Sequence, residues 1–299
     1  MSAAPLRGNL IAAASIFLWA TSFPATDRLL ASWSALPLAA ARLLVAGLAV
    51  GLLAVALGES RVWRRGHLGP AFLLGGLGLG GSVALMILGQ ASTGGLTTAV
   101  LIASMPVVAA LLEMPRRSRP GVFVLLGVAL AVVGGALLAW RPETGGLELR
   151  GGEPLVLASV VVWCWYSRAV AGRLEGLPPT SQSAFTLTAG GVAILAATLL
   201  VEAGGFAPAR FALGGEELLL LLWVGAVAVG LSLPLWLVAV GELGLVPSAI
   251  HQNLGPFYVV ALGLVLGQAL APAQAAAAAL VVAGALLAQL APGRRVETA

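Results

Sequence analysis

The sequence predicts an all-α integral membrane protein with ten transmembrane helices, arranged as two inverted five-helix repeats. The prediction rests on an apolar composition, on hydrophobic stretches long enough to cross a bilayer, and on motifs that recur about 150 positions apart. Hydrophobic residues make up 60% of the 299 residues and charged residues only 9%, with a mean hydropathy of +1.01. Soluble domains carry about 25% charged residues, so this composition excludes an ordinary soluble protein.

Ten stretches of the chain are apolar enough to form a transmembrane helix, which needs about 20 residues. They cover residues 9–27, 35–57, 68–90, 95–113, 120–140, 154–171, 181–202, 216–238, 246–267 and 272–291. The breaks carry arginine clusters, prolines or glycine-rich polar segments such as RPETGGLELRGGEP. The first stretch is longer than the apolar region of a signal peptide and is followed by a poor cleavage site, so we read it as a retained helix.

The arginines predict the orientation in the membrane. All 16 basic residues are arginine, and the abundance of glycine and alanine is typical of a GC-rich bacterial genome. If the N-terminus is cytoplasmic, eleven arginines fall in cytoplasmic segments and four in outside segments, with Arg42 alone inside a span. Because cytoplasmic loops are enriched in arginine and lysine, we expect both termini in the cytoplasm of a bacterial inner membrane.

Matching motifs in the two parts of the chain indicate a duplication. VVGGALLA at 132–139 recurs as VVAGALLA at 281–288, and Pro106 recurs as Pro256. Ser82 and Met86 have Ser232 and Trp236 as their counterparts. We therefore expect one repeat at residues 1–145 and another at 146–299. Five spans per repeat reverse the orientation between copies, and inverted repeats are typical of secondary transporters with a substrate site at the midplane.

These motifs also resemble a known family. WATSFPA in the first span, ARLLVAGL in the second, a mid-helix proline in the fourth and ninth, and GALLA closing each half are similar to the EamA branch of the drug/metabolite transporter superfamily. Within that branch the chain looks most like the YddG-type exporters of aromatic amino acids. The resemblance implies a ten-helix membrane transporter.

Polar and aromatic residues inside the spans are the candidate substrate contacts, because such residues face the protein interior or a water-filled cavity. Trp19 and Trp163 lie about halfway along their spans, too deep for the tryptophan belt at a membrane surface. The serines of the same stripes also suit simple helix packing. The expected substrate-binding set is Trp19, Ser82, Met86, Trp163, Tyr166, Trp236, His251, Gln252 and Tyr258.

The ninth span holds the most polar tripeptide of any span, His251-Gln252-Asn253, followed closely by Pro256. Proline lacks a donor and clashes with the carbonyl four residues back, which predicts a kink and a free acceptor at Gln252. Pro106 predicts the same interruption in the fourth span, and we expect the two prolines to act as hinges. We expect His251 and Gln252 to face the pathway and Asn253 to bond a neighbouring helix; a purely packing role for the cluster is the alternative.

Arg42 and Asp27 are the charged residues expected to have structural roles. Arg42 lies about two turns inside the second span, where it can extend to the outer surface or pair with Asp27. Binding a substrate carboxylate is the alternative role for Arg42.

The residue types missing from the spans narrow the function. No carboxylate lies deep in a span, which disfavours proton exchange for cationic drugs, and one buried cation is too few for phosphorylated sugars. No Walker motif, catalytic arrangement, metal site or cofactor motif is present, so we expect no enzyme and no cofactor.

The remaining substrates are neutral or zwitterionic. We expect export of aromatic or bulky neutral amino acids by alternating access, through facilitated diffusion, with export of drugs or other amphipathic metabolites as the alternative. The expected partners are a small-molecule substrate and the lipid bilayer, with no nucleic acid, and the chain can act as a monomer.

Overall fold

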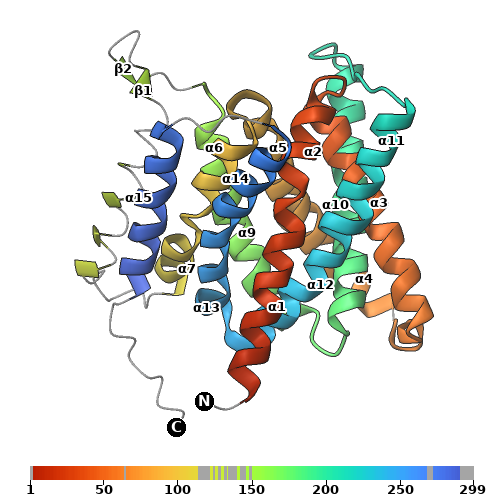
Figure 1. Ribbon diagram of the computed structural model, residues 1–299. Coiled ribbons are helices and arrows are strands. Elements are labelled where there is room, and N and C mark those ends of the chain that lie inside the picture. Colours follow the sequence, from red (N-terminus) through yellow and green to blue (C-terminus); the bar gives the residue numbers. More distant parts are fainter. Residues whose placement is uncertain are drawn as a thin grey trace.

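The computed structural model is a bundle of helices that run roughly along one axis (Figure 1). It describes residues 3–63, 65–113, 150–267 and 272–289, together with single residues and pairs between 122 and 147. An apolar chain in a bilayer favours helices because they satisfy every backbone group within the segment.

In the part of the chain up to residue 113, the third predicted span (68–90) is an irregular helix and the fourth (95–113) is a helix in two pieces. Its elements are α1 (Ala3–Ala20), α2 (Ser22–Leu30), α3 (Ala35–Ala56), the 3-10 turns η1 (Glu59–Val62) and η2 (Arg65–His67), α4 (Leu68–Leu73), the π-helix η3 (Leu74–Gly80), α5 (Gly81–Thr93), α6 (Gly95–Ile102) and α7 (Met105–Glu113).

The part after residue 139 begins with two short strands and then repeats much of this order. Its elements are β1 (Trp140–Arg141), β2 (Gly146–Leu147), α9 (Glu153–Arg173), α10 (Pro179–Ala203), α11 (Gly215–Leu222), the π-helix η4 (Trp223–Leu231), α12 (Ser232–Leu243), α13 (Leu245–Ile250), the 3-10 turn η5 (His251–Leu254), α14 (Gly255–Val265) and α15 (Pro272–Gln289). The two strands pair antiparallel in the connection between the expected repeats.

Six segments of the described chain are long and apolar enough to cross a membrane. They are Leu6–Leu30, Ala35–Ala56, Leu68–Thr93, Gly95–Glu113, Pro179–Ala203 and Gly215–Leu243, which coincide with six of the predicted spans. Helix α9 lies where the sixth span is predicted, the α13–η5–α14 segment where the ninth is, and α15 where the tenth is. Most of the fifth predicted span, 120–140, falls outside the described residues, so the total of ten stays a prediction.

Corresponding elements share the same irregularities at an offset of about 150 residues. The π-helices η3 and η4 each run directly into a regular helix, α5 and α12. Each of those helices ends at a glycine with positive φ, 80° at Gly94 and 86° at Gly244, a conformation that favours glycine. Each is followed by a helix that breaks before a proline. The duplication of the chain and the inverted arrangement of its two five-helix repeats stay predictions.

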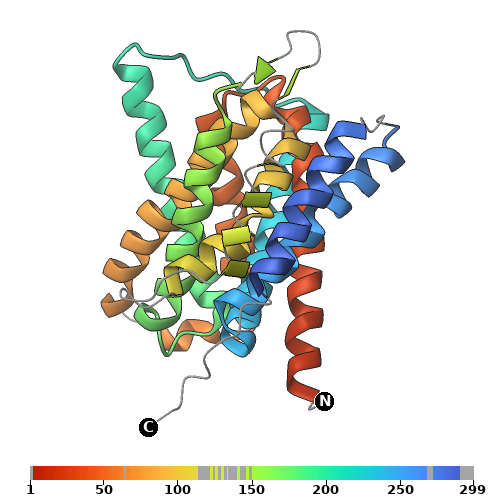
Figure 2. The ribbon, with the colours of Figure 1, turned by 90° about the vertical axis from the view of Figure 1, so that its left-hand side faces the viewer.

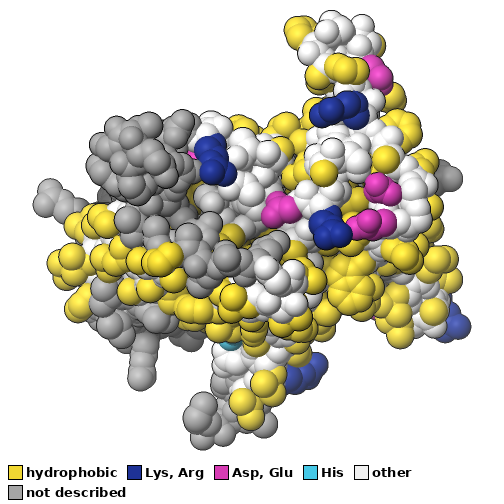
Figure 3. All heavy atoms as spheres, turned by 45° about the horizontal axis from the view of Figure 1, so that its top comes forward, with side chains coloured by type: hydrophobic (Ala, Val, Ile, Leu, Met, Phe, Trp, Pro, Cys, Tyr) yellow, Lys and Arg dark blue, Asp and Glu magenta, His cyan; other side chains and the backbone are white. Residues whose placement is uncertain are grey.

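The surface is apolar along the flanks and charged at the ends. Leu52, Leu77 and Leu219 are 63%, 67% and 71% exposed on helix faces that no described element covers. Figure 3 shows hydrophobic side chains along the flank, with acidic and basic side chains gathered on the end that lies at the top of Figure 1. Soluble proteins rarely expose so much contiguous apolar surface. This distribution, with six long apolar helices, indicates a multi-pass membrane protein.

Helices far apart in sequence pack closely at the centre. Helix α10 lies along α3 and η3, α1 packs against α12, and α5 packs against α9. Figure 2, turned by 90° from Figure 1, shows the same bundle with α1 extending below its neighbours toward the N-terminus. The expected repeats therefore interleave, and their contact surfaces surround the middle of the bundle.

Candidate functional site

A small cavity lies where helices from the two expected repeats meet. Residues on α1, α5, α7, α9 and η5 line it, together with Ile102 at the end of α6. Five of the residues predicted to contact substrate are among them. The full lining is Trp19, Ser82, Val83, Met86, Ile102, Met105, Ser159, Val160, Trp163 and Gln252.

Packing fixes the aromatic walls of this cavity. The Trp19 ring meets the Phe23 ring edge-on, with centroids 4.8 Å apart. The Trp163 ring lies 5.6 Å from Tyr166 and 6.1 Å from Trp236. Rings held at several contacts lose little freedom when a substrate binds, so they can present flat apolar faces at low entropic cost.

The hydroxyl groups of the cavity are used within the protein. Ser82 Oγ donates to the Ser159 carbonyl at 2.9 Å, and Ser159 Oγ donates to the Val156 carbonyl at 2.6 Å. The first bond joins α5 to α9, which matches the helix-packing interpretation of the serines, and the second lies within α9. Both hydroxyl oxygens can still accept a bond from a ligand.

Two polar atoms in the cavity wall have no partner. Trp163 Nε1 is a donor and Gln252 Oε1 is an acceptor, and both are buried without a hydrogen bond in the described structure. An unsatisfied buried donor or acceptor costs about 1–3 kcal/mol. A ligand carrying adjacent acceptor and donor groups would remove that cost at both atoms.

Gln252 reaches the cavity because its helix is interrupted. The chain leaves α13 at Ile250, makes the 3-10 turn η5, and resumes as α14 at Gly255. The interruption predicted from Pro256 is present, but the expected free carbonyl is not. The backbone N–H of Gly255 donates to the Gln252 carbonyl, because the tighter 3-10 turn brings a donor one residue nearer.

The equivalent interruption occurs before Pro106. Helix α6 ends at Ile102, and α7 begins at Met105 after a turn at Ala103 and Ser104. The Ser104 hydroxyl bonds back to the Leu101 carbonyl at 2.7 Å and satisfies one acceptor of the turn. Ile102 and Met105 flank this turn and line the cavity, so both interrupted helices contribute to the same site.

The cavity is small in this conformation. Its volume is about 30 Å³, enough for about one or two waters. Pockets that hold small ligands measure about 300–1,000 Å³. A substrate as large as an amino acid therefore requires the surrounding helices to separate.

Four predicted contact residues are not part of the cavity wall. The Tyr166 hydroxyl is bonded to Thr186 Oγ1 at 2.8 Å, and Trp236 Nε1 donates to Ser167 Oγ at 3.0 Å. Tyr258 packs against Phe17 with centroids 5.3 Å apart. His251 is partly buried, and its Nδ1 has no hydrogen-bond partner in the described structure.

Four apolar lining residues were missed by the sequence reasoning. They are neither polar nor aromatic: Val83, Ile102, Met105 and Val160. Val83 and Val160 directly follow Ser82 and Ser159, so their helical position was the available signal.

The expected role of Asn253 is wrong. Its side-chain nitrogen and oxygen are both buried without a hydrogen-bond partner, so it does not bond a neighbouring helix. The 3-10 turn places Asn253 at a different angle from the one that a continuous α-helix would give. Ser248 Oγ, one turn earlier, is also buried and unpartnered.

Neither structural contact expected of Arg42 is present, while its alternative role, binding a substrate carboxylate, stays a prediction. Arg42 is 1% exposed, so it does not extend to the surface, and no ion pair joins it to Asp27. Its Nη1 donates only a long 3.4 Å bond to Thr26 Oγ1, and its Nε has no partner in the described structure. The carboxylate of Asp27 instead accepts bonds from Gln90 Nε2 and the backbone N–H of Gly95, both at 2.9 Å.

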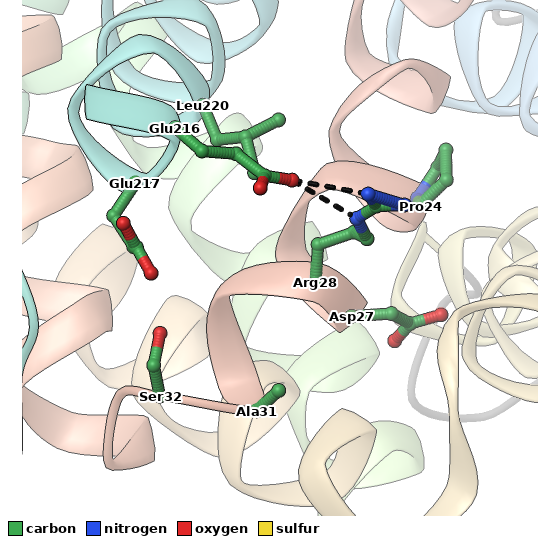
Figure 4. Close-up of a pocket in the computed structure, with 8 residues that line it drawn as sticks. All are labelled: Pro24, Asp27, Arg28, Ala31, Ser32, Glu216, Glu217 and Leu220. Atoms are coloured by element: carbon green, nitrogen blue, oxygen red, sulfur yellow. Dashed lines mark hydrogen bonds and ion pairs between the residues drawn. The ribbon is translucent and has the colours of Figure 1, made fainter. Parts of the chain in front are cut away.

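A second, open pocket of about 470 Å³ lies at the charged end of the bundle, between α2 and α11. Figure 4 shows Arg28 donating two bonds to Glu216, at 3.0 and 3.3 Å, while Asp27 points away from that pair. Both side chains of the pair are mostly exposed, so the interaction contributes little to stability. Among the described residues, the acidic side chains lie near helix ends or in connections, and none lines the central cavity.

The described residues contain no cluster of three or more histidine, cysteine or acidic side chains that could hold a metal ion. The chemistry available at the central cavity is therefore aromatic contact and neutral hydrogen bonding.

Comparison with known proteins gives a family match for part of the chain and a fold match for nearly all of it. Residues 6–140 match the EamA-like transporter family. A solved structure described as "Crystal structure of protein" superposes with a TM-score of 0.68 at 24% identity, over 98% of this chain and 99% of that chain. That likeness shows the fold over nearly the whole length. No curated protein sequence matches the chain.

Proposed function

We propose that this chain, whose residues 6–140 match the EamA-like transporter family, is a secondary transporter that exports aromatic or bulky neutral amino acids. The observation that carries the proposal is the cavity with two tryptophan rings in its wall and two unpartnered polar atoms, Trp163 Nε1 and Gln252 Oε1. An amino acid offers a carboxylate to the indole N–H and an ammonium group to the amide oxygen. The tryptophan rings and methionines would receive its side chain.

Alternating access accounts for the small volume of the cavity. Helices from both expected repeats enclose it, and the two interrupted helices meet there. Moving one repeat against the other would enlarge the site and open it to one side of the membrane at a time. Pro106 and Pro256 lie at the interruptions, where missing backbone bonds make bending easier.

Facilitated diffusion is the proposed energetic mode. No carboxylate lines the cavity among the described residues, so the usual proton-carrying group of a drug antiporter is not in place. His251, beside the cavity residue Gln252, is the group through which proton coupling would act if transport proved to depend on a pH gradient.

The alternative is an exporter of drugs or other amphipathic metabolites. Met86 and Met105 favour it, because methionine is flexible and adapts to differently shaped ligands. The free donor and acceptor favour amino acids, since a purely apolar drug would leave both unsatisfied.

Counterflow in proteoliposomes tests the function. Vesicles preloaded with unlabelled tryptophan should accumulate labelled tryptophan and phenylalanine at least about tenfold faster than labelled glutamate or lysine, and an ionophore that collapses the pH gradient should leave the rate unchanged. Vesicles without protein are the control. Absence of counterflow for every amino acid, together with export of amphipathic dyes, would contradict the proposal and favour an exporter of drugs or amphipathic metabolites.

The proposed orientation places the protein in a bacterial inner membrane with both termini cytoplasmic. A reporter that is active only in the periplasm, fused after Ala299, should be inactive. Activity of that fusion would contradict the orientation.

A further inference from the structure

A third pocket lies on the apolar flank of the bundle, and no charged side chain lines it. It measures about 620 Å³ and lies between α4, η3, α5 and α10, with Leu36 of α3 at one end. All its lining residues are apolar: Leu36, Gly69, Phe72, Leu73, Gly76, Leu77, Gly80, Gly81, Ala84, Ala193, Ile194 and Ala197. We call this pocket the lateral groove.

The lateral groove follows one helix face through most of the membrane thickness. Its residues on α4, η3 and α5 recur every three or four positions from Gly69 to Ala84, which is the spacing of a single helix face. At 1.5 Å per residue this face is about 22 Å long. The hydrocarbon core is about 30 Å thick, so the groove is longer than one leaflet of a bilayer.

Glycine keeps the groove open at positions where helix packing does not demand it. A Cβ added at Gly80 would meet the Gly190 backbone at 3.0 Å, so Gly80 is explained by the close approach of α10. A Cβ added at Gly69 or Gly81 would meet nothing within 4 Å. Those two glycines leave space that the protein itself does not fill.

The connection that precedes the groove in the sequence is basic. Gly69 follows a connection that carries Arg61, Arg64 and Arg65 against one carboxylate, Glu59. This connection is anchored beside α10, because Trp63 Nε1 donates to Ser181 Oγ and Ser181 Oγ donates to Glu59 Oε2, both at 2.7 Å. Arginine clusters at the membrane end of an interhelical pocket suit anionic lipid headgroups.

We propose that the lateral groove binds one anionic phospholipid, with an acyl chain along the Gly69–Ala84 face and the headgroup phosphate at the exposed Arg61. The bound chain lies against the helix whose Ser82 and Met86 line the central cavity. The site is independent of the transported substrate, so its test does not depend on transport.

Native mass spectrometry of the full-length protein, stripped of lipid and supplied with phosphatidylglycerol or phosphatidylethanolamine, tests the proposal. The parent should retain one phospholipid and prefer phosphatidylglycerol about tenfold. Gly81→Leu should reduce this adduct about tenfold by filling the groove. Gly51→Leu is the matched control, because a Cβ at Gly51 of α3 also meets nothing within 4 Å but does not line the groove.

Two further variants separate lipid binding from folding and from charge. Ala197→Leu fills the groove from α10 and should reproduce the loss if Gly81→Leu fails to fold. Arg61→Gln should lower the preference for phosphatidylglycerol while leaving binding of phosphatidylethanolamine unchanged. Equal lipid adducts in the groove variants and in Gly51→Leu would overturn the proposal. So would the absence of a preference between the two lipids in the parent. A mass of two protein chains that the groove variants abolish would also overturn it.

Discussion

Trp163 and Gln252 line the same small cavity, and each carries a polar atom, Nε1 and Oε1 respectively, that is buried without a hydrogen-bond partner in the described structure. One is a donor from the middle of α9 and the other an acceptor from the interruption between α13 and α14. Their neighbours contrast with them, since the Tyr166 hydroxyl and Trp236 Nε1 both have partners within the protein. The proposed function assigns these unpaired atoms to the substrate.

Replacing Trp163 with phenylalanine should reduce transport without lowering stability. The substitution removes the free N–H and part of the ring, so counterflow of tryptophan should fall several-fold, in keeping with a hydrogen bond of about 0.5–1.5 kcal/mol. The thermal unfolding midpoint in detergent should stay near that of the parent, because Nε1 bonds nothing in the protein.

The matched variant is Trp236→Phe. It removes the bond to Ser167 and should lower the free energy of unfolding by about 1 kcal/mol. Parent-like counterflow in Trp163→Phe would assign Trp163 to packing alone.

Asn253→Leu and Gln252→Leu should differ in their effects on stability and transport, because Gln252 lines the cavity and Asn253 does not. Neither amide oxygen is bonded, and Asn253 lacks a partner at its nitrogen as well. We expect Asn253→Leu to raise the free energy of unfolding by about 1 kcal/mol, because it removes an unsatisfied buried group, and to leave transport in place.

Gln252→Leu should instead stop counterflow, because Gln252 lines the cavity and its unpartnered oxygen is the proposed acceptor for the substrate, while the protein remains folded. Chemical denaturation and counterflow on the two variants supply the comparison. A large loss of stability in Asn253→Leu would show that Asn253 bonds a neighbouring helix after all.

Pro256→Ala should slow transport with little change in stability. The Gln252 carbonyl already receives the Gly255 N–H, so the donor gained at residue 256 replaces a bond rather than satisfying an empty acceptor. We expect the free energy of unfolding to stay within about 1 kcal/mol of the parent, while a straighter helix bends less readily.

Pro106→Ala and the double variant test the equivalent interruption. Counterflow rates would be measured together with the labelling of an introduced cysteine from each side of the membrane. The labelling would report which facing conformation each variant favours. Parent-like rates in all three proline variants would show that the prolines shape the fold without acting as hinges.

Asp27→Ala should destabilise the protein more than Arg28→Ala, which removes the nearby ion pair between Arg28 and Glu216. Asp27 joins α2 to Gln90 and to the first N–H of α6, so its removal leaves two donors unsatisfied and should cost about 1–3 kcal/mol. Arg28→Ala removes an exposed pair and should cost about 0–1 kcal/mol. Equal unfolding midpoints for the two variants would contradict this ranking.

The sequence by itself determined where the described chain can cross a membrane and where its helices break. Hydropathy located the six long apolar helices because burial in lipid depends on composition summed over about 20 residues. Pro106 and Pro256 located the interruptions because the missing donor and the ring clash are covalent properties of proline. Helical spacing also placed Trp19, Ser82, Met86 and Trp163 among the candidates for one site.

Only the tertiary structure decided which partner each polar group takes and how much space remains. Asp27 bonds Gln90 and Gly95 rather than Arg42, because packing brings the start of α6 to its carboxylate. Helical spacing gives relative positions within one helix, but the rotation of that helix depends on neighbours distant in sequence. The π-helices and the 3-10 turn change that rotation further, since each departs from 3.6 residues per turn. For this reason Tyr166 and Trp236 bond within the protein, while Trp163 and Gln252 face the cavity with their polar atoms free.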